Sequence, residues 1–285
     1  MKKILVPLCL LVACSAFAAS WGPTGHRITA EIAQRHLTDK AQKAIQDLAG
    51  PYPLAKLSTW ADEIRSDPAW DFVKPWHYIS VDEDETLDAV LKRDHKDGQI
   101  ANVVEAIQFF HALLKGDAAN TRIFEAMMAE HKVEPLMGST RATALALLIH
   151  FVGDVHQPLH VGRTYDLGGN KIAVLWFGER SNLHEVWDES MIEQQKLSYT
   201  EFVQFIDHPA DQEVRTWQNA GVETWAQESI GHRKALYATA YQKTDFTSGL
   251  PTLSYEYPFK NLPVVKDRLL KGGIRLAALL NEAFG

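Results

Sequence analysis

The stretch from Thr140 to His156 constrains the fold of this chain most strongly. Nearly all of its side chains are apolar, yet it is too short to span a membrane as a helix. It carries His150 and Asp154, which stand four residues apart and therefore share one face of a helix. Burying a carboxylate among apolar side chains is costly unless the carboxylate is paired or binds a metal. The stretch predicts a buried central helix with two potential metal ligands.

Other helices are predicted on both sides of this stretch. Thr24 is expected to cap a helix that continues to Ala33. Residues 101–114 repeat apolar side chains at the spacing of one helical face. Residues 263–284 form a predicted C-terminal helix, with Pro263 in its first turn, where proline is tolerated.

Strand signals are confined to one region. Residues 171–177 are strand-like and follow the turn signal Gly168-Gly169-Asn170. Residues 248–261 contain two prolines and three aromatic side chains and are interpreted as an extended surface connection. The sequence therefore predicts a mainly α-helical, single-domain fold with a small β-hairpin.

The first twenty residues resemble a secretory signal peptide. Lys2 and Lys3 precede an apolar run at 4–13, and small residues follow up to Ser20. We expect cleavage after Ser20, a catalytic domain over 21–285, and a periplasmic or secreted protein. Both cysteines lie in the leader, so no disulfide supports the mature fold. The sequence before Cys14 also resembles a lipoprotein cleavage box, which is the alternative form of processing.

The charge balance limits the modes of substrate binding. The formal net charge is −7, and loss of the two leader lysines makes it −9. An acidic surface argues against nonspecific binding of polyanions through lysine and arginine. A polyanionic substrate remains compatible if bound cations hold its phosphates. We expect a monomer without a membrane span or a stable protein partner.

A second histidine–aspartate pair reinforces the metal interpretation. His184 and Asp188 repeat the four-residue spacing, and His160 closes the segment that begins at His150. Imidazole nitrogens and carboxylate oxygens are preferred zinc ligands. Two such pairs in one chain indicate a multi-metal hydrolytic site.

Other candidates have simpler explanations when they are taken singly. Asp62 suits the first turn of a helix capped by Thr59. His77 suits a hydrogen-bonded core histidine, and His26 suits a surface loop. The remaining histidines are expected to be structural or exposed: His36, His95, His111, His131, His208 and His232.

Taken in order, these residues closely resemble the zinc-dependent S1/P1 nuclease family. The shared motifs are Trp-Gly-x-x-Gly-His at 21–26, Trp-Ala-Asp at 60–62, Trp-His-Tyr at 76–78, His-Phe-x-Gly-Asp-x-His-Gln-Pro-Leu-His at 150–160, Gly-Gly-Asn at 168–170 and His-x-x-Trp-Asp at 184–188. The resemblance implies a mainly α fold and three zinc ions. It assigns Asp62, His77, His150 and Asp154 to the first, His160, His184 and Asp188 to the second, and Trp21, His26 and a bridging Asp154 to the third.

The resemblance also implies an activity. Family members cleave single-stranded DNA and RNA to 5′-phosphate products and dephosphorylate 3′-nucleotides. Neighbouring zinc ions can lower the pKa of a shared water from ~16 to ~7, which supplies hydroxide. Asp62 would orient this hydroxide, and Arg65 would stabilise the transition-state charge. His156 is expected outside the ligand set, as a supporting or helix-terminal residue.

Substrate contacts are implied in the same way. Tyr78 would stack on an unpaired base, Leu167 would line the base pocket, and Asn170 would contact phosphate or base. Ser80 stands where relatives often carry an aspartate that reads the base edge, which leaves base preference open; Asp82 is a possible substitute.

Three other functions remain compatible with the sequence. A zinc phospholipase C shares the implied fold, but those enzymes typically end the ligand set with glutamate where Asp188 stands. A zinc-storage protein would not need the Asp62–Arg65 pair. A helical adhesin with incidental histidines would retain its fold without zinc.

Overall fold

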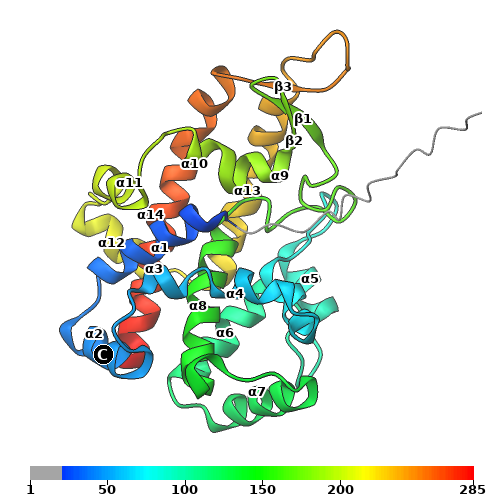
Figure 1. Cartoon of the computed structure of the whole chain (residues 1–285). Coiled ribbons are helices and arrows are strands. Elements are labelled where there is room, and N and C mark those ends of the chain that lie inside the picture. Colours follow the sequence, from blue (N-terminus) through cyan, green and yellow to red (C-terminus); the bar gives the residue numbers. More distant parts are fainter. Residues whose placement is uncertain (1–20) are drawn as a thin grey trace, which may run out of the picture.

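Helices make up most of the protein. The computed structural model describes residues 21–285, so the expected signal peptide and the Cys14 processing alternative lie outside the described residues. The α-helices are α1 (Pro23–Arg35), α2 (Asp39–Ala49), α3 (Leu54–Leu57), α4 (Trp60–Glu63), α5 (Leu87–Asp94), α6 (Val103–Leu114), α7 (Ala118–His131), α8 (Thr140–His156), α9 (Leu183–Glu185), α10 (Met191–Glu193), α11 (Tyr199–Ile206), α12 (Asp211–Gln218), α13 (Val222–Ala240) and α14 (Glu256–Phe284) (Figure 1). Short 3₁₀ helices cover Ile64–Ser66, Pro68–His77 and Leu136–Gly138, and a π-helical turn covers Val186–Ser190. The predicted mainly α fold is confirmed.

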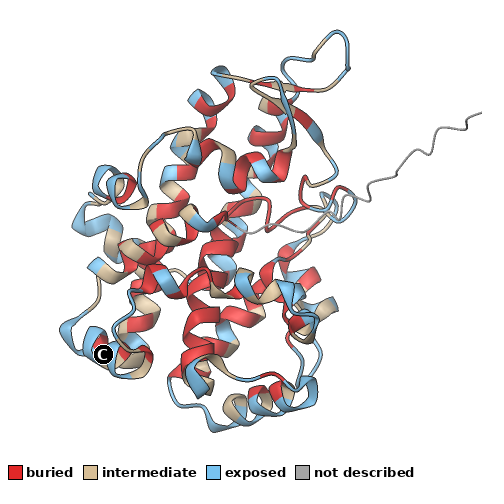
Figure 2. Cartoon of the chain, in the orientation of Figure 1, coloured by how far each residue is buried: buried red, intermediate tan, exposed pale blue. Residues whose placement is uncertain are grey.

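Helix α8 is the centre of the molecule, as predicted. The Ser139 side chain caps it by accepting a hydrogen bond from the backbone N–H of Ala142. Every residue from Ala142 to His156 is buried, and α1, α3, α4, α6, α13 and α14 pack against the helix (Figure 2). An apolar helix without a polar face is stable only in such surroundings. His150 and Asp154 are therefore held on a rigid, solvent-shielded element.

The long helix α14 packs along α1 and also contacts α8. A Cβ atom at Gly273 would lie 2.4 Å from Cβ of Ile32, so only glycine permits this close crossing of α14 and α1. The predicted start at Pro263 is wrong, because α14 already begins at Glu256. Pro258 lies in the first turn, where a missing N–H costs nothing. Burial of Tyr257 and its hydrogen bond from Trp187 stabilise this turn despite the prolines.

Two further boundary predictions need correction. Helix α1 begins at Pro23 with Gly22 as its N-cap, so Thr24 is not the cap. A proline at the first helical position has the required φ and no N–H to satisfy, which explains the earlier start. The predicted surface connection at 248–261 is wrong over its second half, which belongs to α14. Helix α6 begins at Val103, close to its predicted start, after a cap by Asn102.

The small sheet confirms the predicted hairpin and adds a strand. Strands β1 (Ala173–Trp176) and β2 (Glu179–Asn182) pair antiparallel, and β3 (Thr252–Leu253) pairs parallel with β1. The expected turn precedes β1, with positive φ angles at Leu167, Gly168 and Gly169. A Cβ atom at Gly168 would lie 2.3 Å from the carbonyl oxygen of Leu159, so glycine is required there. This turn thereby packs directly on the segment that follows α8.

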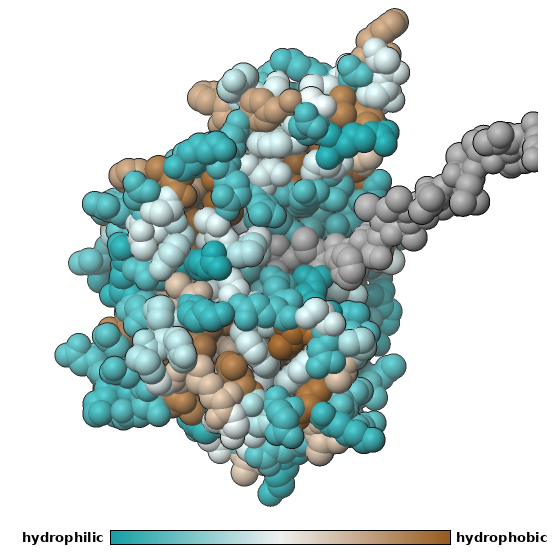
Figure 3. Space-filling model, viewed as in Figure 1, coloured by the Kyte–Doolittle hydropathy of each residue, from teal (hydrophilic) through white to brown (hydrophobic). Residues whose placement is uncertain are grey.

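Two apolar clusters surround the segment that follows α8. One gathers α6, α8 and the aromatic side chains of the 3₁₀ helix Pro68–His77. The other gathers Trp21, Trp187 and the middle of α14. The face seen in Figure 3 is mostly hydrophilic, with apolar surface in separate patches. Among the described residues, no helix has the length and apolar character needed to cross a membrane.

Candidate metal centre

Seven separate backbone segments bring the predicted ligands together. His26 lies on α1, Asp62 on α4, and His77 at the end of a 3₁₀ helix. His150 and Asp154 lie on α8, and His160 follows in the next turn. The remaining two lie on α9 and the π-helical turn. We call the set the metal cluster: His26, Asp62, His77, His150, Asp154, His160, His184 and Asp188. Its ligand atoms form three groups, each compact enough to surround one ion: His26, His150 and Asp154; Asp62, His77 and His150; and His160, His184 and Asp188.

Asp154 is the hub of the cluster. Its Oδ2 lies 3.0 Å from Nδ1 of His77 and 3.3 Å from Nε2 of His150. Its Oδ1 lies 3.4 Å from Nε2 of His26 and 3.6 Å from Nδ1 of His160. A fully buried carboxylate therefore has four imidazoles around it, and its two oxygens face different histidines.

The second histidine–aspartate pair forms its own group. Nε2 of His184 lies 3.1 Å from Oδ2 of Asp188, and Nε2 of His160 lies 3.6 Å from Oδ1 of Asp188. Asp188 lies in the π-helical turn, a distortion often found at functional sites. Backbone N–H of Gly22 donates to the carbonyl of Asp188 at 2.8 Å. This bond brings the start of α1, and with it Trp21, to the second group.

Backbone carbonyls fix the orientation of three imidazoles. Nδ1–H of His150 donates to the carbonyl of Ser58 at 2.7 Å, and Nδ1–H of His160 donates to the carbonyl of His77 at 2.7 Å. Nδ1–H of His184 donates to the carbonyl of Gly168 at 2.6 Å. A carbonyl can only accept, so Nδ1 carries the proton and Nε2 keeps its lone pair. This arrangement is the usual support for a metal-binding histidine.

Several buried atoms of the cluster have no hydrogen-bond partner. They are Nδ1 and Nε2 of His26, Nε2 of His77, Nε2 of His150, Oδ1 of Asp154, Nε2 of His160 and Oδ2 of Asp188. Leaving a buried polar atom unsatisfied costs about 1–3 kcal/mol, and more for a charged group. One nitrogen of His26 carries a proton, and the other atoms are acceptors. So many orphaned acceptors within one buried site fit bound cations. The donor set therefore suits metal ions on the geometry alone.

Burial also changes the protonation of the cluster. Desolvation lowers the pKa of His26 and His77 well below the usual range, and it lowers the pKa of His150 as well. Neutral imidazole is the form that binds metal. Desolvation, followed by the charge of Asp62, raises the pKa of Asp154. The protein thus holds neutral histidines around a carboxylate that needs a nearby positive charge to remain ionised.

Arg65 lies at the edge of the cluster. Its Nη1 donates to Oδ1 of Asp62 at 2.9 Å, and the same oxygen lies 3.8 Å from Nε2 of His150. Both Arg65 and Asp62 are partly exposed. The Asp62–Arg65 pair therefore lies between the solvent and the buried histidines.

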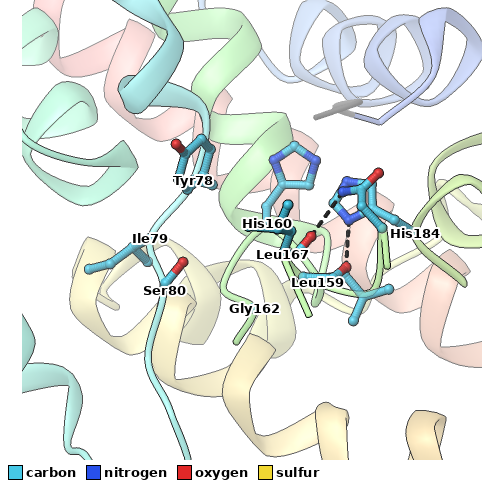
Figure 4. A pocket seen from close by; sticks show the side chains of 10 residues that line it. Tyr78, Ile79, Ser80, Leu159, His160, Gly162, Leu167 and His184 are labelled. Atoms are coloured by element: carbon cyan, nitrogen blue, oxygen red, sulfur yellow. Dashed lines mark hydrogen bonds between the residues drawn. The ribbon is translucent and has the colours of Figure 1, made fainter. Parts of the chain in front are cut away.

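A cavity of about 250 Å³ adjoins the second group. Its walls include the three predicted substrate residues, Tyr78, Leu167 and Asn170, beside His160 and His184. Figure 4 labels Tyr78 and Leu167 together with the two histidines. Tyr78 is 40% exposed and Leu167 is 49% exposed, so apolar surface is presented to a ligand. The Asn170 amide donates to the carbonyl of Leu167 at 2.9 Å and thereby braces the turn.

Residues 78–80 form one wall of the cavity, and the loop with Leu159 and His160 forms the wall that faces it. Figure 4 shows Tyr78, Ile79 and Ser80 on one segment, across from the loop that carries Leu159 and His160. Asp82, considered as a base-reading residue, instead accepts a hydrogen bond from the backbone N–H of Thr164 at 2.8 Å. It is absent from the residues that line the cavity. The cavity wall offers the hydroxyl of Ser80 and no carboxylate.

His156 and Gln157 follow the ligands of α8 but have different partners. The imidazole of His156 contacts Arg275 rather than the metal cluster, which agrees with its expected exclusion from the ligands. Gln157 was not predicted as a functional residue, but its buried amide donates to Asp188. Its position between His156 and His160 was the only available signal, because its partner lies far away in the sequence.

The chain is similar to known nucleases along most of its length. The family model S1/P1 Nuclease matches residues 21–285. Endonuclease 2 of Arabidopsis thaliana is 32% identical over 93% of this chain and 91% of its own length. Endonuclease 4 of the same plant is 32% identical over 94% of this chain and 90% of its own. Nuclease S1 of Aspergillus oryzae is 28% identical over 99% of this chain and 98% of its own. The protein belongs to the S1/P1 nuclease family, and its buried cluster of histidines and aspartates is its candidate metal centre.

Proposed function

We propose that this nuclease is a zinc-dependent phosphodiesterase that cleaves single-stranded DNA and RNA. Its products would carry 5′-phosphates, and 3′-nucleotides would lose their phosphate. One observation carries the proposal: three compact groups of buried imidazoles and carboxylates meet around Asp154, with acceptor atoms that lack hydrogen-bond partners. Such a set suits several cations at one site, and phosphodiesters are the anions that such a site attracts.

The ligand chemistry favours zinc. Nitrogen ligands from five histidines accompany oxygen ligands from three aspartates, whereas magnesium and calcium sites are built from oxygen. We assign one ion to Asp62, His77, His150 and Asp154, and a second to His160, His184 and Asp188. We assign the third to His26, Asp154 and the amino group and carbonyl of Trp21. Trp21 is fully buried, and the bond from Gly22 to Asp188 holds its backbone beside the cluster.

The residues around the ions have distinct roles in the proposal. Bound zinc supplies a water of lowered pKa and a Lewis acid for a phosphate oxygen. Asp62, which Arg65 holds by a hydrogen bond, orients the attacking water. The Arg65 guanidinium keeps further donors for the negative charge that grows on phosphorus oxygens. Both side chains stand where solvent meets the cluster, the position that an incoming phosphodiester must reach.

The cavity supports the proposed preference for single strands. A base that stacks on Tyr78 must leave its own helix, and a strand without a partner offers such bases directly. Leu167 adds apolar surface, and Asn170 fixes the turn that carries it. The chain has a net charge of −7, so we assign the phosphate attraction to the cations and Arg65 rather than to a basic groove.

Processing of the N-terminus belongs to the same proposal. We take residues 1–20 as a signal peptide and 21–285 as one catalytic domain of a periplasmic or secreted monomer. Only cleavage before Trp21 gives that residue a free amine, because the amide nitrogen of a longer chain is a poor ligand. A chain that keeps residues before Trp21 should therefore bind fewer ions.

The proposal is tested on mature protein that begins at Trp21. Metal analysis should find about three zinc ions per chain, and single-stranded DNA and RNA should be cut much faster than duplex. End-group analysis should find 5′-phosphates. A zinc content of one or none after reconstitution, or products with 3′-phosphates, would contradict the proposal. The matched control is the same chain with an N-terminal tag, which should lose zinc and most activity.

A further inference from the structure

The side chain of Gln157 joins the end of α8 to the second ligand group. Gln157 is fully buried and follows directly after His156, the last residue of α8. Its Oε1 accepts a hydrogen bond from the backbone N–H of Leu159 at 2.5 Å. Its Nε2 donates to Oδ1 of Asp188. The amide is therefore held from both ends.

The two partners settle which way the amide points. The N–H of Leu159 can only donate, so it faces the amide oxygen. The NH₂ group then faces Asp188, whose ionised carboxylate can only accept. Because neither partner can exchange roles, the amide has one stable orientation, and it favours the charged form of Asp188.

Because of this contact, the two oxygens of Asp188 have different surroundings. Oδ1 receives the amide N–H of Gln157. Oδ2 lies 3.1 Å from Nε2 of His184 and has no hydrogen-bond partner. A carboxylate pinned through one oxygen cannot rotate freely, so the direction of the other oxygen is fixed as well.

The turn around Gln157 is itself tied to two of the three ligand groups. Its backbone N–H donates to the carbonyl of Asp154 at 2.9 Å, and its carbonyl accepts from the N–H of His160 at 3.0 Å. Arg268 holds the preceding carbonyl, that of His156, at 3.1 Å. One short segment thus fixes the position of Asp154, His160 and, through the amide, Asp188.

We propose that Gln157 is the positioning residue for the metal site formed by His160, His184 and Asp188. This rests on the proposed function, since it concerns the second zinc ion of that site. The amide holds Asp188 through Oδ1 and keeps Oδ2 directed at the ion. Loss of such a supporting hydrogen bond costs about 10–100-fold in metal affinity or activity in other metalloproteins.

Two substitutions separate the contacts of the amide. Gln157→Met keeps the approximate length of the side chain and removes both hydrogen bonds. Gln157→Glu keeps an acceptor for the N–H of Leu159 and, when its carboxyl is ionised, has no proton to donate to Asp188. The matched control is Gln34→Met, because Oε1 of Gln34 also accepts a backbone N–H, that of Leu54 at 3.0 Å, and no ligand of the metal cluster is its partner.

The measurement is the zinc content of mature protein after dialysis against a graded series of chelator concentrations. A second readout is the visible absorption of the cobalt-substituted protein, which reports ligand geometry without any assay of activity. Both Gln157 variants should lose one of about three ions at a chelator concentration about 10–100-fold lower than the unaltered protein requires, and their cobalt spectra should change. Gln34→Met should match the unaltered protein in both respects.

The possible failures are distinguishable. Unaltered mature protein that binds no zinc would defeat the proposed function itself. Unaltered protein with about three ions, together with Gln157 variants that retain them equally well and share its cobalt spectrum, would overturn only the role of Gln157. Gln157→Glu that behaves like unaltered protein at every pH from about 7 to about 9 would likewise overturn it, because the bond to Leu159 would then suffice without a donor to Asp188. Circular dichroism of each variant identifies a chain that has failed to fold.

Discussion

Two polar clusters contact the last turns of α8. They differ in whether their side-chain atoms have hydrogen-bond partners. The metal cluster contains His150 and Asp154, and many of its acceptor atoms have no hydrogen-bond partner. The second cluster contains His156, Glu228, Arg268 and Arg275, and we call it the arginine cluster. None of its side-chain atoms is among the unpartnered atoms of the described chain.

The arginine cluster is closed by its own hydrogen bonds. Arg275 donates from Nη1 and Nη2 to the two carboxylate oxygens of Glu228, both at 2.7 Å. Nη1 of Arg275 also lies 2.9 Å from Nε2 of His156, whose Nδ1–H donates to the carbonyl of Val152 at 2.7 Å. Arg268 bonds to Glu228 as well. The cluster joins α13 and α14 to the end of α8 without any added ion.

The comparison shows what separates a ligand from a structural histidine. His150 and His156 lie on the same helix, six positions apart, and both are fully buried. Nε2 of His156 meets a guanidinium, whereas Nε2 of His150 faces other acceptors. A buried acceptor that faces only other acceptors requires a cation, and a buried acceptor that faces a donor does not. The two clusters should therefore respond differently to substitution.

The largest effect is expected for Asp154→Ala. Asp154 contributes to two of the three proposed ions, so its loss should reduce the zinc content from about three ions to about one and abolish nuclease activity. Metal analysis and a single-stranded DNA assay measure both. Asp154→Ala protein that keeps three ions would show that Asp154 does not bridge two of them.

A large effect on stability, without loss of zinc, is expected for Glu228→Gln. The substitution removes the carboxylate that pairs with two buried guanidinium groups; because Glu228 is itself partly exposed, we expect a loss of about 2–3 kcal/mol, below the range for a fully buried pair. Urea unfolding should show the loss, and the folded variant should still bind about three zinc ions. A variant that loses zinc while its stability is unchanged would mean that the arginine cluster belongs to the metal site.

A substitution in the cavity beside the metal cluster should affect substrate binding without affecting zinc content. Tyr78→Ala should raise the KM for single-stranded DNA by the loss of about 1–3 kcal/mol of stacking, with zinc content unchanged. Tyr78→Phe retains the ring and is the matched control. Equal KM values for the alanine variant and the unaltered protein would remove Tyr78 from the substrate site.

The smallest expected effect is a dependence of stability on acid pH. Burial alone would raise the pKa of Glu228, but Arg275 and Arg268 lower it from 4.5 to about 2. A depressed pKa stabilises the folded state above pH 4.5, and this contribution is lost as the pH falls towards 2. Glu228 is partly exposed, so we expect about 1–2 kcal/mol after solvent screening. The difference in unfolding free energy between unaltered protein and Glu228→Gln, measured from pH 6 to pH 2, should shrink by this amount; a constant difference would contradict the assignment.

The sequence predicted the helix that carries His150 and Asp154 better than it predicted α14 and the small sheet. The apolar run around His150 and Asp154 predicted α8, because an apolar run of this length and the cost of buried charge are local signals. The start of α14 was missed because its prolines suggested a loop, whereas packing of Tyr257 stabilises a helix there. Strand β3 was missed because it has two residues and forms only by pairing with β1.

Contacts between distant residues could not be predicted from local patterns. Gln157 reaches Asp188, and Arg275 reaches His156, across more than a hundred positions in the latter case. Nothing near Arg275 in the sequence marks it as buried, since arginine is almost always exposed unless it is paired. The direction of each imidazole on α8 likewise depends on neighbours that only the folded chain supplies.

Anomalous scattering of zinc in crystals of the mature, zinc-loaded protein tests the trinuclear site without any assay of activity. Difference maps from data on either side of the zinc absorption edge should show three peaks within the metal cluster, each bounded by one proposed ligand set. They should show none at the arginine cluster. A single peak, or peaks that avoid Asp154, would contradict the claim that the orphaned acceptor atoms mark a trinuclear zinc site.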